Sequence, residues 1–316
     1  MRISGVTYAA RKTHKARNIT LTAIILILLI ILSIVIISAY NGWGLLHPAK
    51  KDVAAFSSNI VPEYRDISFR GTDKNVLLNG WFFQTKSNEK TVILAHSYGS
   101  NRLEFGNKSL DMIKSFLNKG YNVFTFDFRN SGKSGGKLTT LGYYEKDDLL
   151  AAVDYVKKQG SKQIVLMGFS TGASAAILAA AGRDDVEAVI ADSPYANLKD
   201  YLESNLGRWS KLPSFPFNRT VLISMEVFSG MDTGNADPMS ALSDLSPSRL
   251  FLIHGKGDKV IPADNSRKLY SAYSSINPAL AEIWETDDSG NADSYEKYPE
   301  EYMDRVFKFL DAGAQK

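Results

Sequence analysis

Apolar residues occur along most of the chain in short continuous runs. Runs such as VILA, NVFTF, IVLMGF, AVIA and LFLI show no alternation of apolar and polar positions. Strands covered on both faces have this pattern, whereas half-exposed strands alternate with a period of two. The runs therefore predict a buried, mostly parallel sheet. The strands that we expect span residues 65–70, 76–83, 91–96, 121–126, 163–168, 186–191, 249–254 and 281–285.

Segments with helical spacing of apolar residues separate these runs. Residues 110–118, 144–158 and 173–181 have this spacing and complete βαβ units. The first strands lack such crossovers, so we expect an antiparallel start. Residues 194–246 break the pattern with prolines and aromatic residues. We expect a partly helical cap there, with a plain surface excursion as the alternative, because long structureless loops are uncommon in compact domains.

The first part of the chain has a different pattern. Ile19–Ala39 carries no charged residue, and about 20 such residues cross a hydrocarbon core of about 30 Å. We therefore expect one transmembrane helix at 19–39. The alternative is a cleaved signal peptide, whose apolar region is normally only about 7–15 residues long. The predicted organisation is a basic tail at 1–18, this helix, a stalk at 40–63 and one α/β domain at 64–316.

The distribution of charge predicts the orientation in the membrane and limits the partners. Five of the 37 Lys and Arg residues precede the apolar segment, which leaves 32 against 34 Asp and Glu, a net charge of about −2. The basic tail predicts an inside N-terminus and a domain outside the cell, with Trp43 as an interface anchor. A near-neutral domain has no electrostatic footprint for nucleic acid. The chain has no cysteine, which excludes disulfides, thiol catalysis and thiolate metal sites.

A short motif at a predicted strand–helix junction carries the candidate chemistry. Gly168-Phe169-Ser170-Thr171-Gly172 follows an apolar strand and precedes a helix of small residues. In a nucleophile elbow the serine occupies such a sharp turn, and small neighbours let its hydroxyl project above the sheet. An ordinary βα turn is the alternative. We predict that Ser170 is a nucleophile.

The chain from about Tyr64 onward resembles the α/β-hydrolase superfamily, in particular its serine aminopeptidase-like and small esterase branch. The stretch from His96 to Arg102, HSYGSNR, resembles the family's His-Gly-x-Gly-x-Asn-Arg loop, with Ser97 where glycine is usual. The resemblance implies that the backbone N–H groups of Tyr98 and Thr171 form the oxyanion hole, which stabilises the negative charge that develops in acyl transfer. It also implies an eight-stranded sheet with helices on both faces and a short cap.

Two further segments match this pattern. HGKGDKVIP after the seventh strand resembles the segment that carries the acid of the triad, which assigns that role to Asp258. Asp192, after the preceding strand, is the rival acid. DFRNSGKSG, which begins at Asp127, resembles a structural turn of the family. His96 and His254 match positions that shape loops.

The third member of a Ser–His–Asp triad is missing. Counting back from Pro299-Glu300-Glu301-Tyr302, the resemblance places Asn291 where the family has histidine, and no histidine follows His254. An amide does not titrate in the useful range, and an unassisted serine is a weak nucleophile. Asp288 and Asp293 are alternative bases, although an unperturbed carboxylate with a pKa near 4 suits neutral pH poorly.

The sequence therefore leaves several functions open. The first is a membrane-anchored serine hydrolase that acts on a small-molecule ester or peptide and is impaired by Asn291. The second is an inactive relative that binds a ligand or a partner outside the cell, and the third is a protein whose fold is only an interaction scaffold. Fold alone does not decide between them. No metal or nucleotide cofactor is implied, because the chain lacks a P-loop, a Gly-x-Gly-x-x-Gly turn and a ligand cluster.

Overall fold

The computed structural model describes residues 15–54, 61–86 and 89–313. Within these residues, eight strands form one sheet in the order β1-β2-β4-β3-β5-β6-β7-β8. β1 pairs antiparallel with β2 and β2 with β4, and every later pairing is parallel. The predicted antiparallel start and parallel remainder are therefore confirmed. The strands are β1 Arg65–Arg70, β2 Leu77–Phe83, β3 Lys90–Ala95, β4 Asn122–Asp127, β5 Gln163–Phe169, β6 Val186–Asp192, β7 Arg249–Gly255 and β8 Ala281–Thr286.

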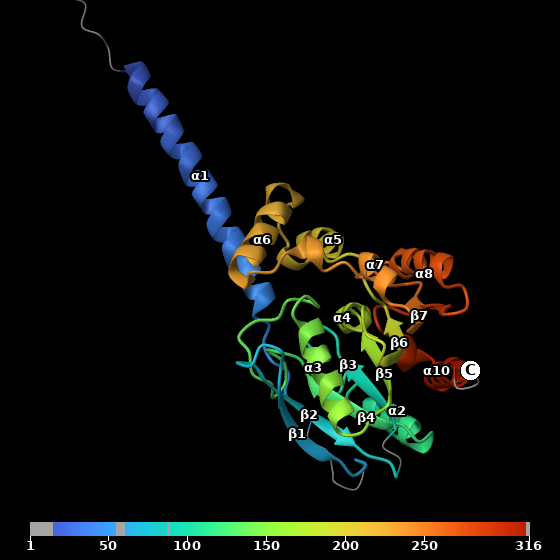
Figure 1. Ribbon diagram of the computed structural model, residues 1–316. Helices are drawn as coiled ribbons and strands as arrows, with labels where there is room; N and C mark the ends of the chain where they lie inside the picture. Colours follow the sequence, from blue (N-terminus) through green and yellow to red (C-terminus); the bar gives the residue numbers. More distant parts are fainter. Residues whose placement is uncertain (1–14, 55–60, 87–88, 314–316) are drawn as a thin grey trace, which may run out of the picture.

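Helices cover both faces of the sheet (Figure 1). Their bounds are α2 Lys108–Asn118, α3 Glu145–Lys158, α4 Thr171–Ala180, α8 Asp264–Ile276, α9 Ser294–Lys297 and α10 Pro299–Gly313. In β3, Ile93 and Ala95 belong to an apolar cluster that includes residues of α3, α4 and α8, whereas Val92 and Leu94 belong to a second cluster that includes residues of α2 and α10. Both faces of this strand are thus buried, which explains its continuous apolar run.

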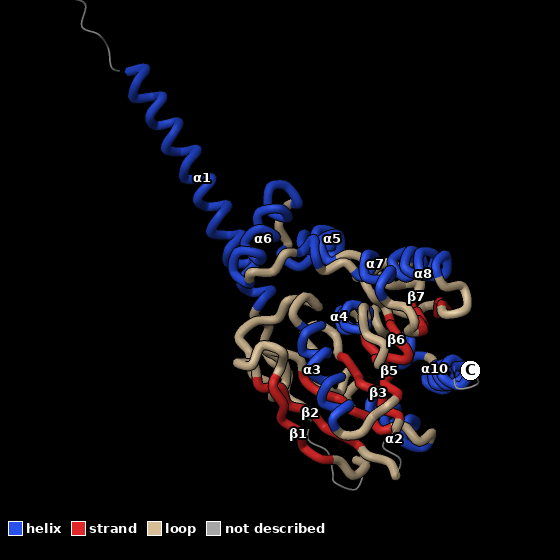
Figure 2. The backbone as a smooth tube through the Cα atoms, viewed as in Figure 1, coloured by secondary structure: helices blue, strands red, loops and turns tan. Residues whose placement is uncertain are grey.

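The region predicted as a cap is largely helical. It contains α5 Leu198–Ser210, α6 Ser214–Ser229, η1 Thr233–Asn235, α7 Pro238–Ala241 and η2 Leu242–Asp244. A third apolar cluster joins this cap to the domain, and it includes Leu141, Tyr195, Leu202 and Met225. Figure 2 shows α5 and α6 at the end of the molecule from which the first helix projects.

The N-terminal helix is longer than the sequence pattern predicts. α1 runs over Lys15–Leu46, and its apolar part is long enough to cross a membrane. Residues 40–46 of the predicted stalk at 40–63 are helical, because α1 continues through Leu46, and Leu46 is fully buried against the cap. Part of the remaining stalk, residues 55–60, lies outside the described residues. α1 is therefore in direct contact with the folded domain.

Candidate active site

The parallel register brings the predicted site residues to one edge of the sheet. Gly168 of β5 is opposite Ala95 of β3 and Ala191 of β6, and Gly255 of β7 is opposite Thr286 of β8. The loops that follow β3, β5, β7 and β8 consequently leave the sheet at the same edge. In open α/β sheets, ligands bind outside the carboxyl ends of the strands.

Ser170 occupies a sharp turn between β5 and α4. Its φ of 52° and ψ of −118° lie in a sparsely populated region that costs on the order of 1–3 kcal/mol when a non-glycine residue adopts it. The turn requires glycine on both sides. A Cβ on Gly168 would lie 2.3 Å from the carbonyl oxygen of Gly172, and one on Gly172 would lie 2.4 Å from that of Ala95. Close backbone packing thus requires the two glycines of the motif.

The loop after β3 is a tight turn. The N–H of Ser100 donates to the carbonyl of Ser97, and Gly99 has a φ of 69° at the third position of this turn. A turn of this form leaves the N–H of its second residue, Tyr98, outside its own hydrogen bond. Tyr98 and Thr171 line the same small hollow, with a volume of about 10 Å³. Thr171 is the first residue of α4, where backbone N–H groups have no partner within the helix.

The serine at position 97 is held by a residue that the sequence analysis did not identify. Its N–H donates to Glu104 Oε2 at 2.8 Å, and its hydroxyl donates to Glu104 Oε1 at 2.5 Å. The hydroxyl of Ser97, which stands where the family has glycine, thus has its own hydrogen-bond acceptor in Glu104. No spacing rule relates Glu104 to this loop, so only the fold reveals the contact.

Asp258 and Asn291 meet as the resemblance implies. Asn291 Nδ2 donates to Asp258 Oδ2 at 2.8 Å. The other carboxylate oxygen, Asp258 Oδ1, accepts the backbone N–H groups of Val260 at 2.7 Å and Ile261 at 2.8 Å. Asp258 is 6% exposed.

Asp192, the alternative acid, lies at the end of β6 and accepts hydrogen bonds from residues next to the site. It is fully buried, and its two oxygens accept hydrogen bonds from Ser193 Oγ at 2.9 Å and Tyr302 Oη at 3.1 Å. Burial raises the pKa of Asp192 to about 7. Ser193 Oγ also accepts the N–H of Ala292 at 2.9 Å, which ties the Asn291 loop to β6.

Both domain histidines have hydrogen-bond partners in the loops around them. Phe128 N–H donates to His96 Nε2 at 3.0 Å, so this nitrogen is the acceptor and Nδ1–H donates to the carbonyl of Ser97. His254 Nδ1 contacts Ser266 Oγ at 2.7 Å, and its Nε2 contacts the carbonyl of Ile261 at 2.7 Å and Asp258 Oδ2 at 3.3 Å. These contacts agree with the loop-shaping roles expected from the sequence.

The alternative base Asp293 is directed into its own loop. Its Oδ2 accepts the N–H of Gly290 at 3.3 Å and lies 3.6 Å from Lys297 Nζ. Asp127, which the sequence analysis treats as structural, accepts hydrogen bonds from Arg102 and from the N–H of Lys133. It therefore joins two loops.

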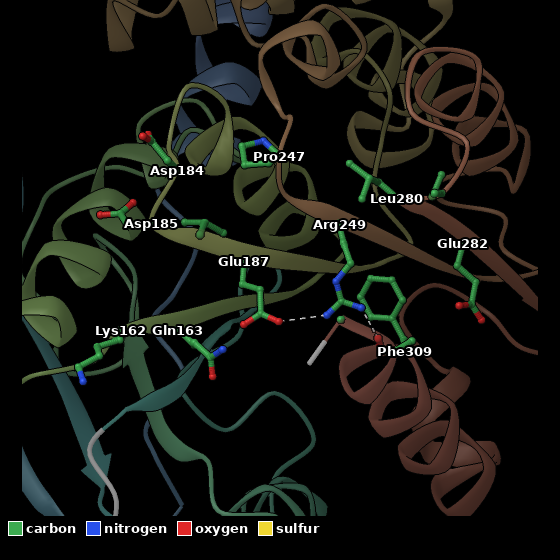
Figure 3. Close-up of a pocket in the computed structure, with 15 residues that line it drawn as sticks. Lys162, Gln163, Asp184, Asp185, Glu187, Pro247, Arg249, Leu280, Glu282 and Phe309 are labelled. Carbon is green, nitrogen blue, oxygen red and sulfur yellow. Dashed lines mark hydrogen bonds and ion pairs between the residues drawn. The ribbon is translucent and has the colours of Figure 1, made fainter. Parts of the chain in front are cut away.

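A larger hollow lies at the opposite edge of the sheet. It has a volume of about 530 Å³ and is lined by residues at the starts of strands, including Gln163 of β5, Glu187 of β6 and Arg249 of β7. Figure 3 shows Arg249 between Glu187 and Phe309, to whose carbonyl it donates a hydrogen bond. This hollow is separated from Ser170 by the length of the strands.

The elbow at Ser170, on a mostly parallel sheet with helices on both faces, defines an α/β-hydrolase. The chain belongs to the family described as serine aminopeptidase, S33, whose family model matches residues 86–249. It is similar to YqkD of Bacillus subtilis, with 31% identity over 238 residues, 74% of this chain and 75% of that protein.

Two further proteins are also similar. The esterase Pf2001 of Pyrococcus furiosus has 31% sequence identity and a TM-score of 0.70, and the match covers 85% of this chain and 98% of that one. The lysophosphatidylserine lipase ABHD12 of Bos taurus is 25% identical over 206 residues, which are 60% of this chain and 47% of the lipase. The match thus spans just under half of that lipase.

Proposed function

We propose that the chain is a membrane-anchored acyl hydrolase of the esterase type, with Ser170 as nucleophile and with turnover limited by Asn291. The observation that carries the proposal is the hydrogen bond from Asn291 Nδ2 to Asp258 Oδ2. An imidazole at this position would present its Nδ1–H to the same oxygen, as in a Ser–His–Asp triad. The site thus retains the acid and its orienting contact, and lacks only a group that takes up a proton.

The proposed reaction is attack of the Ser170 hydroxyl on the carbonyl carbon of an ester. The N–H groups of Tyr98 and Thr171 would stabilise the oxyanion, whose collapse releases the alcohol with the proton of the Ser170 hydroxyl and leaves an acyl-enzyme. Water would then hydrolyse the acyl-enzyme to the free acid and Ser170. The esterase Pf2001 and the lipase ABHD12, which the chain resembles, favour an ester over a peptide substrate. Without a base, proton removal from Ser170 is the slow step.

An inactive relative that binds a ligand or a partner is the second candidate. It is favoured by the fact that the Asp258 carboxylate accepts hydrogen bonds from Asn291, Val260 and Ile261, with no imidazole at position 291. The hydrogen bonds of Asp258 therefore do not depend on a catalytic base, as expected for an inactive relative.

Labelling by a fluorophosphonate tests whether Ser170 is nucleophilic. We expect the full-length chain in detergent to be labelled slowly and at Ser170 alone, because the oxyanion donors assist the reaction while the hydroxyl is not activated. In-gel fluorescence and peptide mapping give the rate and the site. Ser170→Ala should abolish labelling, whereas Ser204→Ala, which removes an exposed serine of α5, should not. Labelling that persists in Ser170→Ala would contradict the assignment.

The proposed location is tested by protease accessibility. The basic residues before Ile19 favour an inside N-terminus, so we expect protease added to intact cells to remove the domain and to leave an N-terminal tag protected. Immunoblotting with tags at both ends measures this. A protected domain, or a mature N-terminus near Tyr40, would contradict the anchored-outside arrangement.

A further inference from the structure

The cap helix α6 packs directly on the end of the membrane helix. Ser38 Oγ of α1 lies 2.6 Å from Thr220 Oγ1 of α6, and Ser224 Oγ donates to the carbonyl of Ser38 at 3.0 Å. Gly42, one turn further along α1, lies against Ser224 and Met225. Small residues allow two helices to approach this closely.

The same contacts fix the direction of α6 relative to the membrane. Thr220 contacts Ser38, and eight residues later Phe228 contacts Trp43, with ring centroids 5.6 Å apart. The two helices therefore run in the same direction, away from the apolar segment of α1, as Figure 1 shows. Ser38 lies at the last turn of the uncharged segment Ile19–Ala39. The N-terminal end of α6 is consequently level with the end of that segment.

Two further hydrogen bonds hold α1 against the domain. The hydroxyl of Tyr98 donates to the carbonyl of Leu45 at 2.7 Å, and the N–H of Thr139 donates to the carbonyl of Leu46 at 2.8 Å. Both partners are in the domain, so direct hydrogen bonds join the end of α1 to the folded domain.

One exposed face of α6 is apolar from its N-terminal end onward. Phe215 is 90% exposed and Val227 is 74% exposed, and Ile223 lies one turn before Val227 on the same face. Arg219 continues this face and is exposed. The carboxylate in α6, Glu226, is held by the hydroxyl of Thr233 at 2.5 Å. An exposed apolar face that begins where the uncharged segment of α1 ends is suited to contact with the membrane interface.

We propose that α6 enters the interface of the same membrane that α1 crosses, with Phe215 at its N-terminal end deepest in lipid and with Ile223 and Val227 in contact with the headgroup region, near the level of Gly42 and Trp43. The inference rests on the proposed function only in that α1 is taken as a membrane anchor. Interfacial helices bury their apolar face about 5–10 Å into the headgroup and acyl boundary. The cap then lies on the lipid surface.

The absence of cysteine from the chain allows a direct measurement. Single variants Phe215→Cys and Val227→Cys of the full-length chain are labelled with nitrobenzoxadiazole and reconstituted in phosphatidylcholine–phosphatidylglycerol vesicles. We expect blue-shifted emission and a loss of fluorescence when lipids carry a nitroxide near the headgroup. Ile276→Cys, at an exposed apolar position at the end of α8, is the matched control and should show neither effect.

A pair of glycine variants tests the dependence on α1. A Cβ on Gly42 would lie 2.5 Å from Ser224 Oγ, whereas a Cβ on Gly44 meets no atom within 4 Å. In the Phe215→Cys background, Gly42→Leu should therefore reduce the quenching by lipid, and Gly44→Leu should leave it unchanged. Equal quenching in both variants would overturn the role of the α1–α6 contact.

A label at Ile30→Cys separates failure of this inference from failure of the anchor. If lipid nitroxides quench Ile30 but not Phe215 or Val227, α1 spans the membrane and the embedding of α6 is refuted. If the label at Ile30→Cys is also not quenched, α1 does not span the membrane. A blue shift at Phe215 that grows with the protein-to-lipid ratio and resists lipid nitroxides would identify a second copy of the chain as the occupant, and would overturn the proposal. Loss of Ser170 labelling, measured separately, bears only on the hydrolase assignment.

Discussion

Replacing Asn291 with histidine is expected to raise Ser170-dependent ester hydrolysis by about 10²–10⁴, the usual contribution of a general base. Asn291 already donates to Asp258 Oδ2 at 2.8 Å, so the imidazole Nδ1–H has its acceptor in place. Its Nε2 is then free to accept the Ser170 proton. Triad members act as a unit, so the gain depends on both partners. The measurement is the rate of p-nitrophenyl butyrate hydrolysis by the full-length chain in detergent.

The controls for this variant isolate the triad. The gain should vanish when Ser170→Ala or Asp258→Asn is added to Asn291→His. Lys308→His, which places a histidine on the exposed side of α10, should produce no gain. The rate should rise with pH through the imidazole pKa near 6.5, because only the neutral ring accepts a proton. Strong Ser170-dependent hydrolysis in the unaltered chain, unchanged by Asn291→His, would instead show that another residue is the base.

Asp127→Ala is expected to destabilise the domain by about 3–5 kcal/mol, the usual effect of removing one partner of a buried ion pair. Asp127 Oδ2 lies 2.6 Å from Arg102 Nη2, and Oδ1 accepts the N–H of Arg102 at 2.7 Å. The N–H of Lys133 donates to the same carboxylate at 2.8 Å. The variant leaves the Arg102 guanidinium buried without its counter-charge. Such a loss corresponds to a fall in Tm of roughly 6–20 °C for a domain of this size.

Differential scanning fluorimetry of the full-length chain in detergent measures this change. Glu301→Gln is the control, because Glu301 pairs with Arg305 on the exposed surface of α10, where ion pairs contribute little. Its Tm should remain close to that of the unaltered chain. A similar Tm for Asp127→Ala would mean that Asp127 does not stabilise the two loops that it joins.

Residues of the candidate site were predictable where a short sequence motif by itself specifies the backbone conformation. The motif around Ser170 is one such case, because the close approach of Gly168 and Gly172 to neighbouring backbone allows only glycine at either position. The pairing of Asn291 with Asp258 was reached through the family resemblance and agrees with the structure. Glu104 was missed, because its contact with Ser97 depends on how the loop after β3 folds back.

The sequence by itself determined the order and type of the elements, because a buried parallel sheet leaves continuous apolar runs in each strand. It also determined that Asn291 cannot act as a base, since this follows from the chemistry of the amide. Only the tertiary structure decided that α1 continues through Leu46 and packs on α6. Ser38 and Gly42 have no periodic apolar signal that would identify this packing. Their small size becomes informative only when Thr220 and Ser224, distant in sequence, are brought against them.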